Sequence, residues 1–159
     1  MLLKFRSGFQ LVYKPKSLAI DIHFQELLAW LNERGYQPAL RTLRLIDRGT
    51  YGWSEYIAAT ECVSPDEVER FYERQGGYLA LLYALEAVDF HAENVIAAGE
   101  HPMLIDLEAL FHPRVENDDQ AAKNPSQSAL VHSVWPIGLL PQRIWLNEHA
   151  EGIDISGLG

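Results

Sequence analysis

The segment Ser64-Pro65-Asp66-Glu67 constrains the fold of this chain more than any other. It offers a capping hydroxyl, a proline at the first helical position and a glutamate at the third, which together predict a helix start. Apolar spacing continues the helix to about Val88, loosened at Gly76-Gly77. A loop at 89–93 and two apolar runs, 94–98 and 103–107, follow, so we expect helix, loop and hairpin in this order.

The amino-terminal part mixes short strands with one helix. Apolar runs at 2–6 and 9–13 flank Ser7-Gly8 and predict a β-hairpin. Helical spacing of apolar residues predicts an amphipathic helix that starts at Ser17 or Asp21, ends at Arg34 and is followed by Gly35. Looser alternation over 39–46 predicts a strand. The pattern favours the α+β class.

Composition narrows the functional classes. The 159 residues are 48% hydrophobic and carry a formal net charge of −9, which favours a globular protein and disfavours a nucleic-acid or anionic-membrane surface. Cys62 is the only cysteine, so neither a disulfide within the chain nor a cysteine zinc site is expected. We read no signal peptide and no membrane segment, and we expect a cytoplasmic protein.

The segment after the long helix concentrates the chemistry. Asp89 and Asn94 stand five positions apart in a loop, and Asp106 is expected at the end of the second hairpin strand, an order that kinase-type phosphotransferases use. Asp89 could accept the proton of an acceptor hydroxyl, and Asn94 and Asp106 could supply oxygen ligands to Mg²⁺. Glu108, expected on the same side of that strand as Asp106, could join or organise the metal site.

A nucleotide site also needs a cation for its phosphates. Lys14 closes the first predicted hairpin and is our first choice, with Lys16 on the same strand face as the alternative. Glu26 lies in the following helix and is the expected carboxylate partner of the lysine. His91 could orient the loop or touch phosphate, although a purely structural hydrogen bond is equally consistent with its position.

Each signal also has a plainer interpretation. Taken alone, Asp89 could simply follow a helix and Asn94 start a strand, but the ordered set of lysine, helix, loop and hairpin favours function. The aromatic stretch at 51–56 is dense enough for a peptide or base platform, yet such stretches more often pack between lobes.

At these residues the sequence resembles the dehydratase domain of class II lanthipeptide synthetases, the LanM family. The similarity extends over nearly the whole chain in motifs that keep their order, namely Val12-Tyr13-Lys14-Pro15-Lys16-Ser17-Leu18, Arg48-Gly49-Thr50-Tyr51-Gly52-Trp53-Ser54-Glu55, Gln75-Gly76-Gly77, Asp89-Phe90-His91-Ala92-Glu93-Asn94-Val95-Ile96-Ala97, Leu104-Ile105-Asp106-Leu107-Glu108-Ala109-Leu110-Phe111-His112, Gly138-Leu139-Leu140-Pro141 and Ser156-Gly157-Leu158-Gly159.

The resemblance implies a lipid-kinase-like, two-lobe α+β fold that is incomplete here. Residues 1–62 would form an N-lobe-like part with a hairpin, a helix and a strand. Residues 63–159 would form a partial C-lobe with the catalytic loop and the metal-binding hairpin. It implies binding of ATP and Mg²⁺ and phosphorylation of Ser and Thr in a ribosomal precursor peptide, ahead of phosphate elimination to dehydroamino acids. It assigns Lys14 to the nucleotide phosphates and Asp89 and His91 to catalysis. By their positions in these motifs, it assigns Asn94, Asp106 and Glu108 to the metal.

The family is normally much longer, with an upstream Asp-x-His motif, later elimination residues and a zinc-dependent cyclase domain. We therefore expect an internal fragment that carries the phosphorylation half of the site, whose partners are the leader and core peptide and the remainder of the synthetase. Two alternatives stay open. One is a small-molecule kinase of the aminoglycoside phosphotransferase type, and the other is a non-catalytic remnant that binds peptide.

Overall fold

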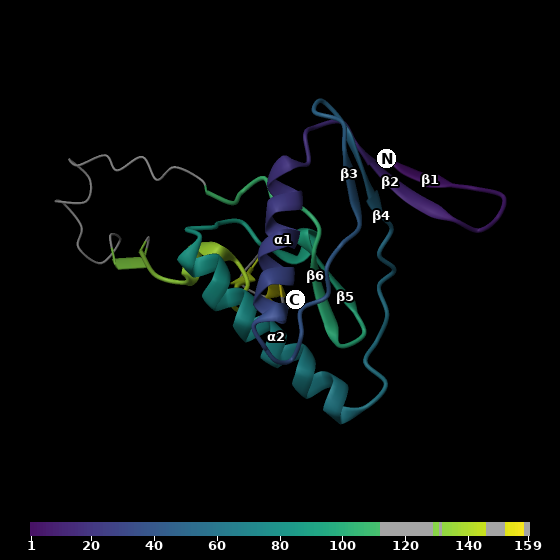
Figure 1. Cartoon of the computed structure of the whole chain (residues 1–159). Helices are drawn as coiled ribbons and strands as arrows, with labels where there is room; N and C mark the ends of the chain where they lie inside the picture. Colours follow the sequence, from purple (N-terminus) through teal and green to yellow (C-terminus); the bar gives the residue numbers. More distant parts are fainter. Residues whose placement is uncertain (112–128, 131, 146–151, 158–159) are drawn as a thin grey trace, which may run out of the picture. The chain divides into compact units, whose positions relative to one another are not determined.

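The first four strands form a small antiparallel sheet, and the first helix lies beside it (Figure 1). The computed structural model describes residues 1–111, 129, 130, 132–145 and 152–157. Strand β1 (Leu2–Lys4) pairs with β2 (Gln10–Lys14), which confirms the predicted hairpin, and Gly8 in its turn has a φ of +86°. Helix α1 (Ala19–Glu33) follows, and Gly35 adopts a φ of +86°, as its predicted place beyond the helix end requires.

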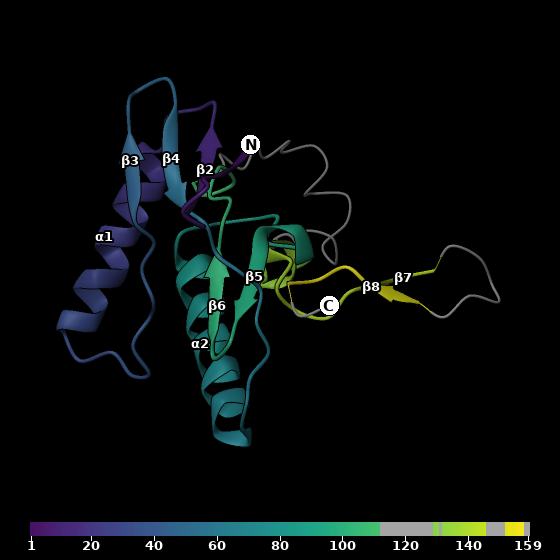
Figure 2. The same cartoon turned by 90° about the vertical axis from the view of Figure 1, so that its right-hand side faces the viewer.

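Two further strands complete this sheet in the order β1-β2-β4-β3, with α1 alongside it (Figure 2). The strand predicted over 39–46 is shorter and later: β3 is Leu45–Asp47. Strand β4 (Gly52–Glu55) was not predicted, because the stretch at 51–56 was interpreted only as an aromatic platform or packing surface. Trp53 instead pairs with Tyr13 across the sheet, with ring centroids 5.0 Å apart.

Close packing explains the glycine in β4. A Cβ atom built on Gly52 would lie 2.4 Å from Leu18 Cδ1 and 2.9 Å from the carbonyl oxygen of Ile46. Leu18 precedes α1 and is fully buried, and Phe24 and Leu28 of α1 are buried with it. A side chain at position 52 would therefore push the start of α1 away from the sheet.

Helix α2 (Pro65–Ala84) begins where the sequence predicts. The Glu67 backbone N–H donates to Ser64 Oγ (3.3 Å), and the Glu67 carboxylate accepts from the Val63 N–H (2.8 Å). The predicted loosening at Gly76-Gly77 and the continuation to Val88 are wrong, since the helix runs unbroken and ends at Ala84. Buried Tyr78 and Leu82 offset the cost of two interior glycines, which is about 1 kcal/mol each.

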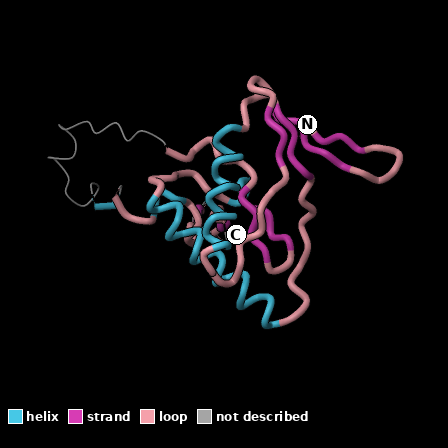
Figure 3. The backbone as a smooth tube through the Cα atoms, in the orientation of Figure 1, coloured by secondary structure: helices cyan, strands magenta, loops and turns pink. Residues whose placement is uncertain are grey.

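The predicted hairpin after the loop is present as β5 (Val95–Ala98) and β6 (His101–Leu104), coloured as strands in Figure 3. Its second strand ends at Leu104, three residues earlier than expected. The remaining described elements are the single 3₁₀ turns η1 (Ala92–Asn94) and η2 (Trp135–Ile137) and the short strand pair β7 (Arg143–Ile144) and β8 (Ile153–Asp154).

The chain divides into two compact units, Met1–Arg74 with Ile96–Met103, and Gln75–Val95 with 104–159 as far as it is described. The proposed lobes at 1–62 and 63–159 stay a prediction. Within the described residues, no helix is both long enough and apolar enough to cross a bilayer.

A buried arginine ties the first unit together. The Arg74 side chain is 6% exposed and donates to the carbonyl oxygens of Ala39 (2.9 Å) and Glu100 (2.8 Å). Arg70 also hydrogen-bonds the Glu100 carboxylate, and this contact, followed by the charge of Arg74, holds the pKa of Glu100 below its ordinary value.

Candidate functional site

The loop that carries Asp89 and Asn94 is closed on itself. Asp89 has a φ of +68°, a left-handed conformation in which Asp and Asn are enriched but which other side chains rarely adopt. The Asn94 side-chain amide donates to the Asp89 carbonyl oxygen at 2.7 Å. This bond uses Nδ2, so Oδ1 is the atom through which Asn94 would contact a cation. The structure thus brings the two predicted residues together, although their roles stay predictions.

His91 sits between them. Its Nε2 lies 3.5 Å from Asp89 Oδ1, and its Nδ1 accepts the backbone N–H of Glu93 at 3.3 Å. Nε2 also lies 3.5 Å from Asn94 Nδ2, so this ring nitrogen faces both predicted residues of the loop. These contacts fit a residue that positions the Asp89 carboxylate, and they serve the loop at the same time.

The loop rests on later segments of the second unit. Phe90 is fully buried, and the N–H groups of Asp89 and Phe90 donate to the carbonyl oxygens of Pro136 (3.1 Å) and Ile137 (2.6 Å). The Ala92 N–H donates to the Ile155 carbonyl oxygen at 3.1 Å. Sequence reasoning did not assign this supporting role to either segment.

Two glycines allow this close approach. Gly138 has a φ of +84°, and a Cβ atom there would lie 3.2 Å from the backbone C and N of Phe90. A Cβ atom on Gly157 would lie 2.8 Å from the Phe90 carbonyl oxygen. The Gly-Leu-Leu-Pro and Ser-Gly-Leu-Gly motifs were the available signal, because both glycines belong to them. Leu158 and Gly159 of the second motif, and His112 of another, lie outside the described residues.

Asp106 follows the hairpin directly. The Ile105 N–H donates to the Asn94 backbone carbonyl oxygen at 3.0 Å, so this segment runs beside the loop within the second unit. Asp106 is half-buried, whereas Glu108 is exposed in a turn. The expectation that both stand on one side of an extended strand is wrong, because β6 has already ended and the chain turns after Leu107.

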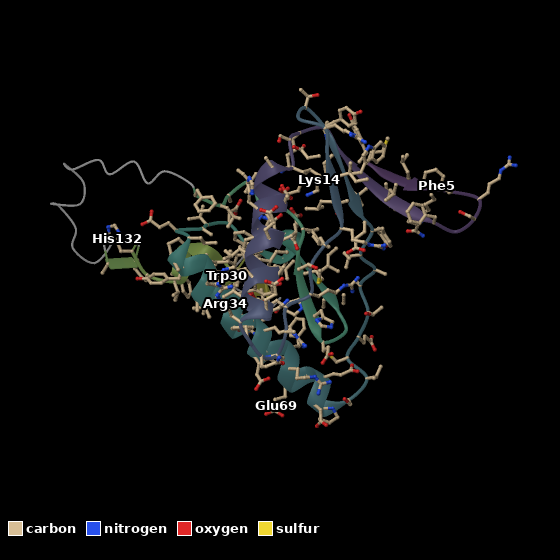
Figure 4. The ribbon with its side chains drawn as sticks, in the orientation of Figure 1. Phe5, Lys14, Trp30, Arg34, Glu69 and His132 are labelled. Atoms are coloured by element: carbon tan, nitrogen blue, oxygen red, sulfur yellow. The ribbon has the colours of Figure 1, made fainter. Side chains whose placement is uncertain are left out.

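Lys14 belongs to the first unit, near the amino-terminal end of α1 (Figure 4). Its Nζ lies 3.9 Å from Asp21 Oδ1, and the two side chains are 17% and 8% exposed. Glu26, the expected partner, lies further along α1, is 68% exposed and pairs with His23 at 2.9 Å. The helix carboxylate beside Lys14 is therefore Asp21. Lys16 is half-buried, and the choice between Lys14 and Lys16 for the nucleotide stays open.

A second carboxylate organises the start of α1. Asp47, the last residue of β3, accepts the Leu18 backbone N–H at 2.9 Å and the Gly49 N–H at 3.2 Å. The hydrogen bond from Leu18 is the main reason that the pKa of Asp47 lies below its ordinary value. Asp47 thus accepts a hydrogen bond from the Leu18 N–H at the start of α1, where backbone N–H groups have no partner within the helix. Leu18 lies four residues after Lys14.

The predicted Mg²⁺ ligands are Asn94 and Asp106. The described residues contain no group of three or more His, Cys, Asp or Glu side chains placed to hold a metal ion. Asn94 and Asp106 would offer two oxygen ligands, which is how Mg²⁺ is usually bound when phosphates complete its coordination. Binding of Mg²⁺ and ATP by these residues stays a prediction.

A pocket opens beside the loop, which we call the loop pocket. It has a volume of about 790 Å³ and lies within the second unit. Its walls are the loop itself, with Asp89, His91 and Glu93, then η2 with Trp135 and Pro136, and β8 with Ile153 and Asp154. Hydrogen bonds from the Ser156 backbone and side chain lower the pKa of Asp154, so this wall is negatively charged at neutral pH.

Comparison with known proteins identifies the family. The model of the family described as "Domain of unknown function (DUF4135)" matches residues 1–159. The lacticin 481/lactococcin biosynthesis protein LcnDR2 of Lactococcus lactis subsp. lactis is 32% identical over 142 residues, which is 83% of this chain and 15% of that protein. The chain thus spans about a seventh of its relative. These matches confirm the resemblance to the LanM family: the chain belongs to the DUF4135 family and is similar to a protein of lacticin 481 and lactococcin biosynthesis.

Proposed function

We propose that the chain carries the phosphorylation half of a lanthipeptide dehydratase site. It transfers phosphate from ATP to Ser and Thr hydroxyls of a ribosomal precursor peptide, in a Mg²⁺-dependent reaction. The likeness to a lacticin 481 and lactococcin biosynthesis protein supports a role in modifying such a peptide. The phosphotransfer itself is argued from the loop.

The observation that carries the proposal is the bond from Asn94 Nδ2 to the Asp89 carbonyl oxygen (2.7 Å). It joins the two ends of the loop, holds Asp89 in its left-handed conformation and leaves the Asn94 oxygen for a cation. The bond thus keeps the Asp89 backbone beside Asn94, so that one loop offers a carboxylate for the acceptor and an oxygen ligand for Mg²⁺.

The chemistry follows from the roles of these side chains. Asp89 accepts the proton of the Ser or Thr hydroxyl while the hydroxyl oxygen forms a bond to the γ-phosphorus of ATP. The bond between the γ-phosphorus and the oxygen that bridges it to the β-phosphate breaks, and ADP leaves. His91, with Nε2 at 3.5 Å from Asp89 Oδ1, keeps the carboxylate oriented. Asn94 and Asp106 would hold Mg²⁺, which neutralises phosphate charge when bound.

Phosphorylation makes the later elimination feasible, because phosphate leaves far more readily than hydroxide. In that step the Cα proton is removed and the Cβ–O bond breaks, giving a dehydroamino acid and free phosphate. We assign no residue of this chain to the elimination. In the proposed assembly the remainder of a synthetase, including a cyclase domain, supplies the other steps.

Lys14 completes the proposed site. We infer that Lys14, which belongs to the first unit, binds the nucleotide phosphates, as in a kinase-like fold. The buried ion pair with Asp21 supports this role, since it fixes an ammonium group at the end of β2.

The test is transfer of labelled phosphate. The chain is incubated with Mg²⁺, γ-labelled ATP and leader–core peptides that contain Ser and Thr, and the labelled peptide is quantified. We expect Asp89→Asn and Asp106→Asn to lower the rate at least about a hundredfold. Glu69→Gln, which neutralises an exposed carboxylate on α2, should leave it unchanged.

Other outcomes would redirect the proposal. Transfer to kanamycin but to no peptide would select the small-molecule kinase of the aminoglycoside type. Peptide binding that ignores ATP and Mg²⁺, without transfer, would select the non-catalytic peptide-binding remnant. Equal transfer by wild type and Asp89→Asn would refute the assignment of the loop.

A further inference from the structure

The loop pocket is larger than an acceptor hydroxyl needs. A Ser or Thr side chain must reach hydrogen-bond distance of Asp89, about 2.6 to 3.2 Å, and would occupy only the edge of the pocket next to that residue. The pocket volume of about 790 Å³ lies within the range of sites that enclose larger ligands. Most of the pocket is therefore left for something other than the reacting group.

Its charge argues against phosphates. Asp89, Glu93 and Asp154 line it, and none of the described residues that line it is Lys or Arg. A triphosphate that filled the pocket would face three carboxylates and no Lys or Arg side chain among these residues, which is unfavourable. A neutral or positively charged occupant is favoured instead.

Part of its wall is apolar and accessible. Trp135 is 45% exposed and Ile153 51% exposed, and Pro136 and Ile155 also line the pocket. An occupant that covers these side chains would remove apolar surface from water, and the indole would give it a large rigid contact. The backbone bonds that hold the loop to Pro136, Ile137 and Ile155 keep these walls next to Asp89.

We propose that the loop pocket is a subsite for an apolar side chain of the acceptor peptide, one or two residues from the phosphorylated Ser or Thr. Consecutive residues of an extended peptide are about 3.3 to 3.6 Å apart, so such a neighbour reaches the pocket while the hydroxyl stays at Asp89. The subsite selects peptide sequence around the acceptor. This inference rests on the proposed function, because it takes Asp89 as the acceptor-binding residue.

The test compares fluorescein-labelled peptides that differ only beside a single Ser, where they carry Leu, Gly or Glu. Binding is measured by fluorescence anisotropy without ATP, and phosphate transfer is measured separately. We expect the Leu peptide to bind and react about tenfold better than the Gly peptide, with the Glu peptide weakest. Ile153→Ser should reduce the preference for Leu at least about threefold.

Ile144→Ser is the matched control. Ile144 is 42% exposed in β7, pairs with Ile153 in β8 and does not line the pocket, so its loss should leave the preference intact. Both isoleucines are exposed, so neither change removes core packing. Asp89→Asn should keep the Leu preference in binding while abolishing transfer.

The outcomes separate this inference from the proposed function. Equal binding and transfer of the Leu and Gly peptides, with transfer still lost in Asp89→Asn, would overturn the subsite and leave the function standing. Displacement of bound peptide by ATP, with nucleotide binding weakened by Ile153→Ser, would overturn it in favour of a nucleotide pocket. Absence of transfer to every peptide would refute the proposed function. In that case, tighter binding of the Leu peptide than of the Gly peptide would support the subsite, and equal binding would overturn it.

Discussion

Gly138 is the position where a single methyl group should disturb the candidate site most selectively. The residue has a φ of +84°, and an added Cβ atom would lie 3.2 Å from both the backbone C and the backbone N of Phe90. The left-handed conformation costs a non-glycine residue about 1–2 kcal/mol. Crowding against a backbone that hydrogen bonds hold in place adds about 1–3 kcal/mol. Gly138→Ala should therefore lower the free energy of unfolding by about 2–5 kcal/mol.

Gly35→Ala is the matched control, because Gly35 has a φ of +86° and nothing within 4 Å of its Cβ position. It should cost only the conformational term of about 1–2 kcal/mol. Urea denaturation of both variants gives the difference in stability. The phosphotransfer assay should show a loss in Gly138→Ala, whose loop is displaced, and near wild-type activity in Gly35→Ala. Equal destabilisation with equal activity would refute the claim that Gly138 positions the loop.

Three further changes test other contacts. Asp21→Asn should raise the KM for ATP roughly tenfold, because it removes the carboxylate that holds Lys14. Glu26→Gln should leave the KM for ATP unchanged. Equal effects of the two changes would contradict Asp21 as the residue that holds Lys14. Asp47→Asn should destabilise the fold more at pH 7 than at pH 3. The pKa of Asp47 is lowered in the fold, so its contribution is present above the unfolded value of about 3.9 and is lost as pH falls through the folded pKa. Urea midpoints at the two pH values measure this difference, and an equal loss at both would contradict it. Arg74→Met should cost about 1–3 kcal/mol by removing the buried donor of the Ala39 and Glu100 carbonyl oxygens, against less than about 0.5 kcal/mol for Arg44→Met, whose side chain is 87% exposed. Thermal denaturation of the two variants measures these losses of stability. A similar loss in Arg74→Met and Arg44→Met would contradict the stabilising role of the Arg74 hydrogen bonds.

Local signals predicted the elements whose reasons are local. The start of α2 depends on Ser64, Pro65 and Glu67, which lie within one turn, and the structure contains the expected contacts. The first hairpin and the end of α1 depend on Gly8 and Gly35, whose positive φ values fit their places. These elements needed no information from distant parts of the chain.

Elements fixed by distant partners were missed or misplaced. Strand β4 begins with Gly52, which disfavours a strand locally, but its pairing with β2 and β3 and the room that it leaves for Leu18 determine its structure. Glu108 was placed on a strand because apolar residues continue to Leu107, yet the pairing that defines β6 ends at Leu104. Apolar sequence alone does not show where a strand loses its partner.

The candidate site divides in the same way. The spacing of Asp89 and Asn94 within one loop was sufficient to find them, and the bond between them joins residues five apart. The partner of Lys14 was placed one turn too late, at Glu26 instead of Asp21, because helix register was guessed from sequence. The loop pocket depends on η2 and β8, which return to the loop from more than 40 residues further along the chain, so no local pattern predicted it.

We propose that Asn94 and Asp106 bind Mg²⁺ together with ATP, that Lys14 contributes to ATP binding, and that Asp89 serves the acceptor. Isothermal titration of ATP, with and without Mg²⁺, tests it most directly. We predict that Lys14→Met weakens binding at least about tenfold, that Asp106→Asn abolishes the dependence on Mg²⁺, and that Asp89→Asn leaves the affinity unchanged. Lys4→Met, at an exposed position of β1, should also leave it unchanged. Unaltered affinity and Mg²⁺ dependence in both Lys14→Met and Asp106→Asn would contradict the account.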